Sequence, residues 1–166
     1  FTGSLDAHGN LDRHEVRSIV QIVSQSPLPC IVTCRAAAEG GAYDGDEMAR
    51  VALYERLGTG GGQTGGKAHP PRYLDIEYAS YVRSANIKQK VTLAVDHPAQ
   101  VRDVHSRLIL SMHDFQGRPA NLLRRVDLMQ SEPAARVVKV AFQARSIRDN
   151  LEALDLLAEN TLGGSG

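Results

Sequence analysis

Four short apolar runs alternate along the chain with longer segments in which apolar residues recur at helical spacing. The apolar runs are typical of buried strands and lie at 30–34, 73–77, 108–111 and 136–142. The helical patterns lie at 12–25, 46–57, 79–107, 119–129 and 146–157. Within the third of these, Pro98 marks a helix start or a break. Because parallel strands need crossover connections that cover the sheet with helices, the alternation predicts βα units around a parallel sheet or barrel.

Composition places the chain among soluble globular proteins of one domain. It has 166 residues, of which 42% are hydrophobic and 23% charged. Lys and Arg number 19, as do Asp and Glu, so the zero net charge gives no sign of a nucleic-acid or membrane-surface partner. The longest apolar runs fall far short of the roughly 20 residues that cross a bilayer. We therefore expect a cytoplasmic protein without nucleic-acid or membrane partners.

The cysteine spacing argues against a disulfide. Cys30 and Cys34 sit four residues apart in the first apolar run. In a strand this spacing spans about 13 Å, whereas the Cα atoms of a disulfide lie within about 7 Å of each other. We expect two free thiols in a reducing compartment. Because the sequence has no Cys-x-x-Cys and no closely spaced His pair, we expect no metal.

A glycine-rich segment at 58–71 interrupts the alternation. Within it, Gly61–Lys67 nearly matches the phosphate-binding pattern G-x-x-x-x-G-K. However, Ala68 stands where a Ser or Thr would coordinate Mg²⁺, and Pro70-Pro71 block the helix that should follow. These departures favour a flexible insertion. The last residues, 163–166, have the composition of a Gly/Ser linker.

One ionisable side chain stands at or near the end of each predicted strand. Side chains alternate between the two faces of a strand, so residues of equal parity share a face. In a parallel α/β sheet, ligands bind at the carboxyl ends of the strands. The sequence therefore predicts one cavity lined by Arg35, Glu77, His113 and Lys139.

These groups indicate chemistry on a carbonyl compound. Lys139 sits in the run Val-Val-Lys-Val-Ala-Phe, where burial and a nearby Arg35 both disfavour the charged amine. A neutral amine forms a Schiff base with a ketone, and His113 can move protons in both directions. Structural alternatives stay open: an edge-strand lysine that reaches solvent, a hydrogen-bonded strand-end histidine, and an arginine paired with Glu39 or Glu77.

The same residues carry a family resemblance. Over roughly residues 28–157 the chain resembles type I 3-dehydroquinase, also called 3-dehydroquinate dehydratase. The blocks that match are Thr33-Cys34-Arg35 with Glu39-Gly40-Gly41, Asp75-Ile76-Glu77, Ser111-Met112-His113-Asp114-Phe115, and Val138-Lys139-Val140-Ala141. Their order and spacing make the set specific. We assign residues 1–162 to a dehydroquinase-like α/β barrel domain.

The resemblance implies a (β/α)₈ barrel of the TIM-barrel type and a cofactor-free syn dehydration of 3-dehydroquinate to 3-dehydroshikimate, a step of the shikimate pathway. Lys139 would attack the C3 ketone to form an imine, which acidifies the C2 hydrogens. His113 would remove one of these protons and then protonate the departing C1 hydroxyl, while Glu39 orients His113 through a hydrogen bond. The substrate-binding side chains would be Arg35, Phe115, Glu77 and Ser111.

Only four strands of such a barrel are visible in the sequence. Family members begin with a strand that bears a Glu-x-Arg motif, and they continue past the last helix with a Met-Gly motif, a second arginine and a Ser/Gln-bearing loop. A complete barrel typically needs about 250 residues. We therefore expect an incomplete barrel of about four parallel strands covered by helices. A homodimer or a fused shikimate dehydrogenase domain are the candidate partners.

Two other functions stay open. A catalytically inactive dehydroquinase-like segment would bind small anions or a partner chain, and the missing flanking strands favour this alternative. Another Schiff-base barrel, such as an aldolase, would also carry a strand lysine, but the Ser111–Phe115 and Glu39–Gly41 blocks argue against it.

Overall fold

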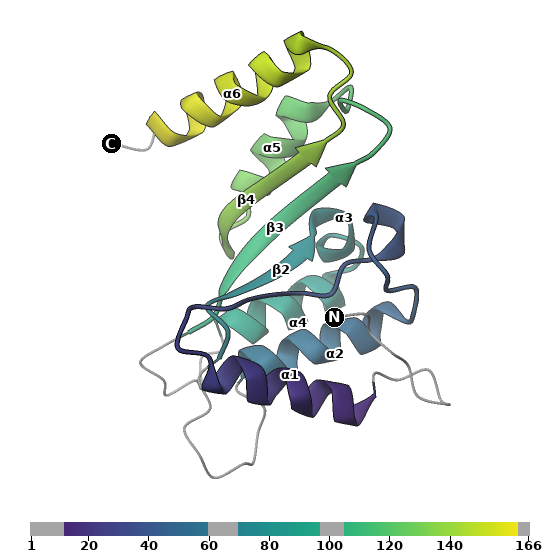
Figure 1. The fold of residues 1–166 in the computed structure, drawn as a ribbon, viewed down its shortest axis with the longest axis vertical. Helices are drawn as coiled ribbons and strands as arrows, with labels where there is room; N and C mark the ends of the chain where they lie inside the picture. Colours follow the sequence, from purple (N-terminus) through teal and green to yellow (C-terminus); the bar gives the residue numbers. More distant parts are fainter. Residues whose placement is uncertain (1–11, 60–69, 97–104, 163–166) are drawn as a thin grey trace.

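Four parallel strands form the sheet that organises the molecule. The structure is a computed structural model that describes residues 12–59, 70–96 and 105–162. The strands follow one another across the sheet in the order β1 (Ile31–Thr33), β2 (Tyr73–Glu77), β3 (Arg107–Asp114) and β4 (Ala135–Phe142). Every neighbouring pair is parallel. The predicted parallel α/β sheet is therefore confirmed (Figure 1).

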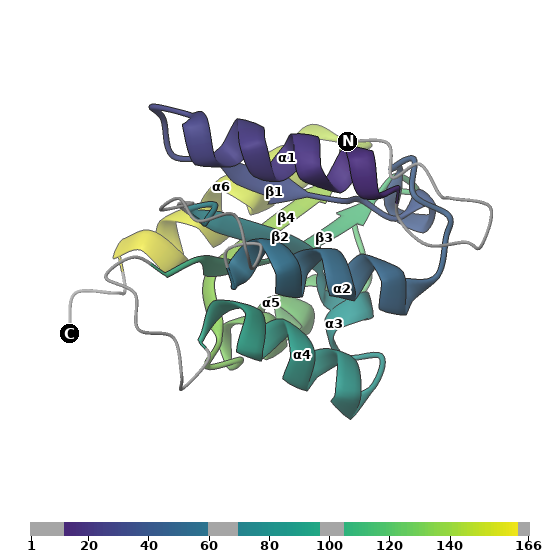
Figure 2. The same cartoon turned by 90° about the horizontal axis from the view of Figure 1, so that it is seen from below.

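Helices connect and flank these strands. They are α1 (Arg13–Gln25), α2 (Glu47–Gly58), α3 (Tyr78–Tyr81), α4 (Ala85–Val95), α5 (Leu122–Gln130) and α6 (Ile147–Leu162), with a short 3₁₀ turn η1 (Ala37–Glu39). Figure 1 places α1, α2 and α4 toward one end of the molecule and α5 and α6 toward the other. Figure 2 shows β1 lying between α1 and α2. Side chains cap several helices: Asp12, Asp46 and Ser84 accept first-turn N–H groups of α1, α2 and α4.

The two faces of the sheet differ as strand periodicity requires. Even-numbered strand residues pack with the helices, and the buried ones among them are Val32, Leu74, Ile76, Leu108, Leu110 and Met112. Helices α2, α4 and α5 contribute Tyr54, Val91 and Val126 to the same core. Burying each large aliphatic side chain stabilises the fold by about 1.5–3 kcal/mol. The side chains of the odd-numbered strand residues lie on the opposite face of the sheet, which carries the polar side chains described below.

One predicted helix is divided in the structure. The segment 79–107 was expected to be mostly helical, but α3 and α4 are separate helices with a break at 82–84. Ser84 explains the break, because its hydroxyl accepts the Ile87 N–H and starts a new helix. Strand β3 begins already at Arg107.

Several sequence expectations fall outside the described residues. They concern the core of the glycine-rich insertion at 60–69, with its near-match to a phosphate loop, and also Pro98 and the tail at 163–166. The flexible insertion and the linker tail therefore stay predictions.

The cysteines are free, as their spacing predicts. Cys30 is partly exposed and Cys34 is fully buried in the core. Burial raises the pKa of the Cys34 thiol to about 12, so it stays protonated at neutral pH.

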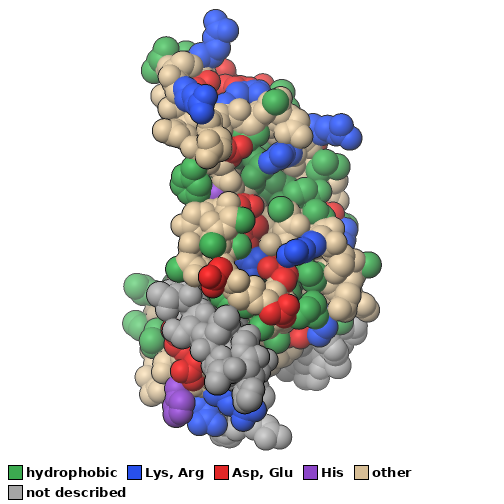
Figure 3. Space-filling view, turned by 90° about the vertical axis from the view of Figure 1, so that its right-hand side faces the viewer, with side chains coloured by type: hydrophobic (Ala, Val, Ile, Leu, Met, Phe, Trp, Pro, Cys, Tyr) green, Lys and Arg blue, Asp and Glu red, His purple; other side chains and the backbone are tan. Residues whose placement is uncertain are grey.

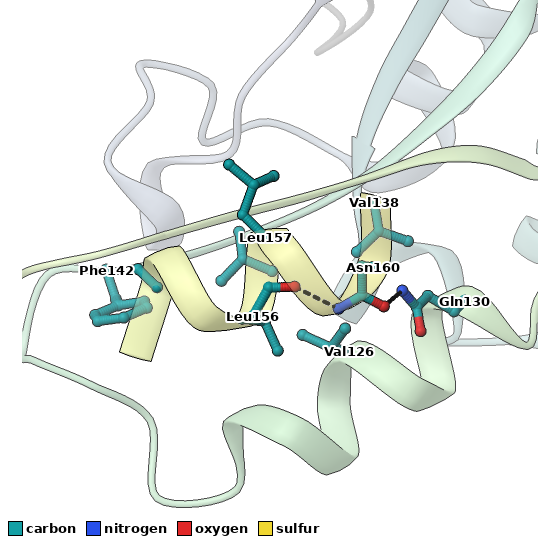
Figure 4. Close-up of a pocket in the computed structure, with 9 residues that line it drawn as sticks. Val126, Gln130, Val138, Phe142, Leu156, Leu157 and Asn160 are labelled. Carbon is teal, nitrogen blue, oxygen red and sulfur yellow. Dashed lines mark hydrogen bonds between the residues drawn. The ribbon is translucent and has the colours of Figure 1, made fainter. Parts of the chain in front are cut away.

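Helix α6 presents an apolar stripe to solvent. The stripe consists of Ile147, Leu151, Leu154 and Leu157, with exposed fractions of 74%, 54%, 62% and 61%. On the sheet side of α6, Leu156 lies beside Val126 of α5 in an apolar pocket, and Asn160 is hydrogen-bonded to Gln130 (Figure 4). No helix within the described ranges has the length and apolar character that crossing a membrane requires.

Candidate active site

The buried carboxylate of Asp75 is hydrogen-bonded to polar side chains from across the sheet. Asp75 lies in β2 and is 3% exposed. Its Oδ1 accepts a hydrogen bond from Ser111 Oγ at 2.6 Å. Its Oδ2 accepts from Arg35 Nη2 at 3.3 Å and from Lys139 Nζ at 3.2 Å. Because Arg35 follows β1, Ser111 lies in β3 and Lys139 lies in β4, one carboxylate links all four strands.

The strand register explains this convergence. Thr33 is opposite Asp75 across β1 and β2, and Ser111 is opposite Lys139 across β3 and β4. These residues share odd parity, so their side chains leave the sheet on the face opposite the helix-packed core. Lys139 is partly open to solvent, with a side chain 46% exposed, whereas the carboxylate that binds it is buried. The amine therefore stands at the rim of the cluster, where a ligand can reach it.

His113 joins the same cluster through Arg35 and Glu39. Glu39 Oε2 accepts the backbone N–H of His113 at 2.9 Å and lies 3.1 Å from its Nδ1. Arg35 Nη1 contacts both ring nitrogens, Nδ1 and, at 2.6 Å, Nε2. A carboxylate only accepts hydrogen bonds, so Glu39 can pair with a protonated Nδ1, while the guanidinium of Arg35 can only donate to the ring. Nε2 is the ring nitrogen that Glu39 does not contact, and it faces the guanidinium of Arg35.

The two glycines after Glu39 are required by close packing. Gly40 has φ +79°, and a Cβ there would overlap the ring of Phe115. A Cβ at Gly41 would overlap the carbonyl group of Arg35. The turn can therefore bring Glu39 to His113 only if both positions lack a side chain. Phe115 itself is 60% exposed and packs on this turn at the edge of the cluster.

The structure does not bring Glu77 into this cluster. We expected its carboxylate in the cavity beside Arg35, but it is 2% exposed and both of its oxygens are engaged elsewhere. Oε2 accepts from Arg50 Nη1 at 2.6 Å, and Oε1 accepts the Ala36 N–H at 2.9 Å. Asp75, two residues earlier, occupies the position that was assigned to Glu77. Ser111 is fully buried and contacts Asp75.

Sequence reasoning missed Asp75 and Arg50 as residues of this region. Asp75 has the same parity as Glu77 in the apolar run 73–77, and that parity was the signal that could have identified it. For Arg50 the sequence carried no such signal, because a helical arginine is ordinarily solvated.

Part of the cluster lies toward the carboxyl ends of the strands, because Arg35 and Glu39 follow β1 and His113 is the next-to-last residue of β3. Figure 3 views the molecule from the right-hand side of Figure 1, the direction of the strand arrows, and shows acidic and basic side chains together across the middle of that face. In the described part of the chain, no group of three or more His, Cys, Asp or Glu side chains is placed to hold a metal ion. The chemistry on offer is that of an amine, an imidazole, a guanidinium and carboxylates.

A model of the type I 3-dehydroquinase family matches residues 4–162. The chain belongs to the type I 3-dehydroquinase family. Among curated relatives, the 3-dehydroquinate dehydratase of Dehalococcoides mccartyi is 31% identical over 133 residues, which are 79% of this chain and 50% of the relative. That of Thermococcus gammatolerans is 32% identical over 161 residues, 92% of this chain and 66% of the relative.

Solved type I 3-dehydroquinases share the fold. The enzyme from Clostridium difficile, solved with covalently modified comenic acid, superposes with a TM-score of 0.69 at 20% identity, covering 89% of this chain and 53% of that chain. The expected barrel-type α/β fold with four parallel strands is thereby confirmed. This type I 3-dehydroquinase chain spans about half the length of most curated relatives that it matches.

Proposed function

We propose that this chain carries the catalytic strands of a 3-dehydroquinate dehydratase, a hydro-lyase that converts 3-dehydroquinate to 3-dehydroshikimate in the shikimate pathway. The observation that carries the proposal is the placement of Lys139 and His113 on one face of the sheet, linked through Asp75 and Arg35. The names of the curated relatives support the same activity.

Lys139 forms the imine. Its amine adds to the C3 ketone, and the carbonyl oxygen leaves as water when the C=N bond is made. The imine draws electrons from C2, so a C2 proton becomes acidic. Asp75 holds the Nζ of Lys139 toward the cluster through the 3.2 Å contact. The partial exposure of Lys139 lets a ketone reach the amine.

His113 moves the proton. Nε2 takes a proton from C2, and the electron pair forms an enamine with the imine carbon. The pair then returns to expel the C1 hydroxyl, which takes the same proton from His113 and leaves as water, the net syn elimination. Hydrolysis of the remaining imine restores the ketone and the free amine of Lys139. Glu39 holds the Nδ1 side of the ring, which leaves Nε2 for the substrate once Arg35 turns from Nε2 to the substrate's oxygens.

The remaining site residues bind the substrate or shape the site around it. Arg35 offers a guanidinium to the hydroxyl or carboxylate oxygens of the substrate. Phe115 closes one side with an apolar ring. Ser111 keeps Asp75 in place by donating a hydrogen bond to its Oδ1.

A dehydration assay together with calorimetric titration tests this function. We expect the chain to bind 3-dehydroquinate and to release 3-dehydroshikimate. Binding of substrate or product without turnover would favour the alternative, a catalytically inactive module for small anions or a partner chain. Turnover of aldol substrates would instead indicate an aldolase.

Partners and location are proposals of the same kind. The exposed stripe on α6 supports contact with more protein, either a second copy of this chain or a fused shikimate dehydrogenase domain. Sedimentation of the purified protein separates a dimer from a monomer. The free Cys30 and Cys34 support a reducing compartment such as the cytoplasm.

A further inference from the structure

We propose that Arg50 and Glu77 are positioning residues: a buried pair that holds the segment Arg35–Gly41 in place against His113. The proposal rests on the proposed function, in which Arg35 and Glu39 serve the reaction. It assigns to Glu77 a role without substrate contact.

Arg50 connects three elements through one guanidinium. It lies on α2 and is fully buried. Nη1 donates to Glu77 Oε2 at 2.6 Å and to the carbonyl oxygen of Cys34 at 2.7 Å. Nη2 donates to Glu47 Oε1 at 2.7 Å and to Ser80 Oγ at 2.6 Å. Although burial opposes the charge, the hydrogen bond that Arg50 donates to Glu47 and the negative charge of Glu77 raise the pKa of Arg50, so it stays protonated.

Glu77 links Arg50 to the backbone next to Arg35. Its second oxygen accepts the Ala36 N–H at 2.9 Å. On the other side of Arg35, the Cys34 carbonyl is held by Arg50, and the Cys34 N–H donates to Tyr54 Oη at 3.0 Å. Buried side chains therefore fix the backbone on both sides of Arg35.

Hydrogen bonds within the turn also tie Glu39 to Ala36. The Ala36 carbonyl accepts the N–H groups of Glu39 at 3.0 Å and Gly41 at 2.9 Å, while the Tyr43 N–H donates to the Arg35 carbonyl at 3.1 Å. The backbone of the turn 36–41 is therefore closed by hydrogen bonds to the carbonyl oxygen of Ala36, and its position depends on that residue. If Ala36 shifts, the carboxylate of Glu39 moves with it and leaves His113.

Removing the Glu77 carboxylate breaks this arrangement in two ways. It removes one of the two carboxylates that pair with the buried guanidinium of Arg50, so that only Glu47 remains, and it leaves the Ala36 N–H without an acceptor. Both defects lie next to Arg35, so the turn is the part of the molecule that relaxes first. Neither Arg50 nor Glu77 is open to solvent, with exposures of 0% and 2%, so neither is placed to bind substrate.

Amide hydrogen exchange measured by NMR tests the proposal without substrate or turnover. The His113 N–H is bonded to Glu39, so its exchange rate reports on the turn, while the Leu110 N–H of the same strand reports on the sheet. We expect Glu77→Ala to speed exchange at His113 by about tenfold more than at Leu110. Glu77→Gln, which keeps an acceptor for Ala36, should give a smaller effect.

Two controls separate positioning from general stability. Val91→Ala, a core change in α4, should speed exchange at His113 and Leu110 equally. In a Glu39→Ala background, Glu77→Ala should have no further effect specific to His113. Equal acceleration at both amides in Glu77→Ala, or an undiminished effect in the Glu39→Ala background, would overturn the proposal. Because exchange is independent of catalysis, these outcomes stand whether or not the chain dehydrates 3-dehydroquinate.

Discussion

Lys139 and His113 project from the same face of the sheet and are joined by two intervening side chains. Lys139 Nζ lies 3.2 Å from Asp75 Oδ2, and that oxygen lies 3.3 Å from Arg35 Nη2. Arg35 Nη1 in turn lies 2.6 Å from His113 Nε2. Under the proposed function, the amine and the imidazole act on neighbouring carbons of one small ketone.

Replacing Lys139 should remove activity and leave the fold intact. In Lys139→Met, Asp75 keeps its contacts with Arg35 and Ser111, so no buried charge is left alone. We expect dehydration to fall to background, with a change of less than about 1 kcal/mol in the free energy of unfolding. Enzyme assay and urea unfolding measure the two quantities. Lys90→Met, which removes an ion pair with Glu55 far from the cluster, should keep full activity. Near-parental activity in Lys139→Met would exclude the Schiff-base role.

His113 and Glu39 should act as one unit. We expect His113→Ala to lower kcat by about 10²–10⁴, the usual contribution of general acid–base catalysis. Glu39→Gln should lower kcat by a smaller factor with little change in KM, because the ring loses its orienting charge but keeps its place. The double variant should be no slower than His113→Ala. A change confined to KM in Glu39→Gln would contradict the orienting role.

The alternation of apolar runs and helical patterns was enough to predict the sheet, and the parity of Arg35 and Lys139 was enough to place them together. Such patterns work because parallel strands force a fixed alternation of faces. The break before α4 was missed because it depends on one side-chain cap at Ser84, which a periodicity of apolar residues does not record.

Parity could not distinguish Asp75 from Glu77. Both acids lie on the same strand with the same parity. Glu77 turns away from the cluster because its carboxylate pairs with Arg50 of α2. Contacts between elements distant in the sequence set this choice. For the same reason the insertion at 60–69, which lies outside the described residues, has only a composition-based prediction.

The turn after β1 should not tolerate a methyl group at Gly41. A Cβ there overlaps the Arg35 carbonyl, which is backbone and cannot swing away. We expect Gly41→Ala to lower the free energy of unfolding by about 1–3 kcal/mol, the usual effect of overpacking. Urea unfolding measures this, and Ala38→Ser, an exposed change in the same turn, serves as the control. A Gly41→Ala protein as stable as its parent would contradict the close packing.

The start of α6 should weaken in acid. The N–H of Arg145 at 2.7 Å and that of Ser146 at 3.0 Å lower the pKa of Asp149 below its ordinary 3.8. The hydrogen bond from Arg118 lowers the pKa of Glu152 below its ordinary 4.5. A carboxyl whose pKa falls on folding stabilises the fold fully above its ordinary value, and this stabilisation is lost as the pH drops through the lower folded value.

We therefore expect the chemical shifts of α6 amides to stay constant above about pH 5 and to move toward unfolded values below about pH 4. NMR spectra across this range measure the effect. Asp149→Asn, which cannot titrate, should show a shallower dependence. An identical pH profile in parent and Asp149→Asn would show that these carboxylates do not hold the helix.

Trapping with sodium borohydride tests the central claim most directly. The chain is mixed with 3-dehydroquinate, reduced, digested and mapped by mass spectrometry, with Lys139→Met treated in parallel. We predict one stable ligand adduct, located on Lys139, and none in the variant. An adduct on another lysine, or none on the parent chain under conditions where it binds the ligand, would contradict the account.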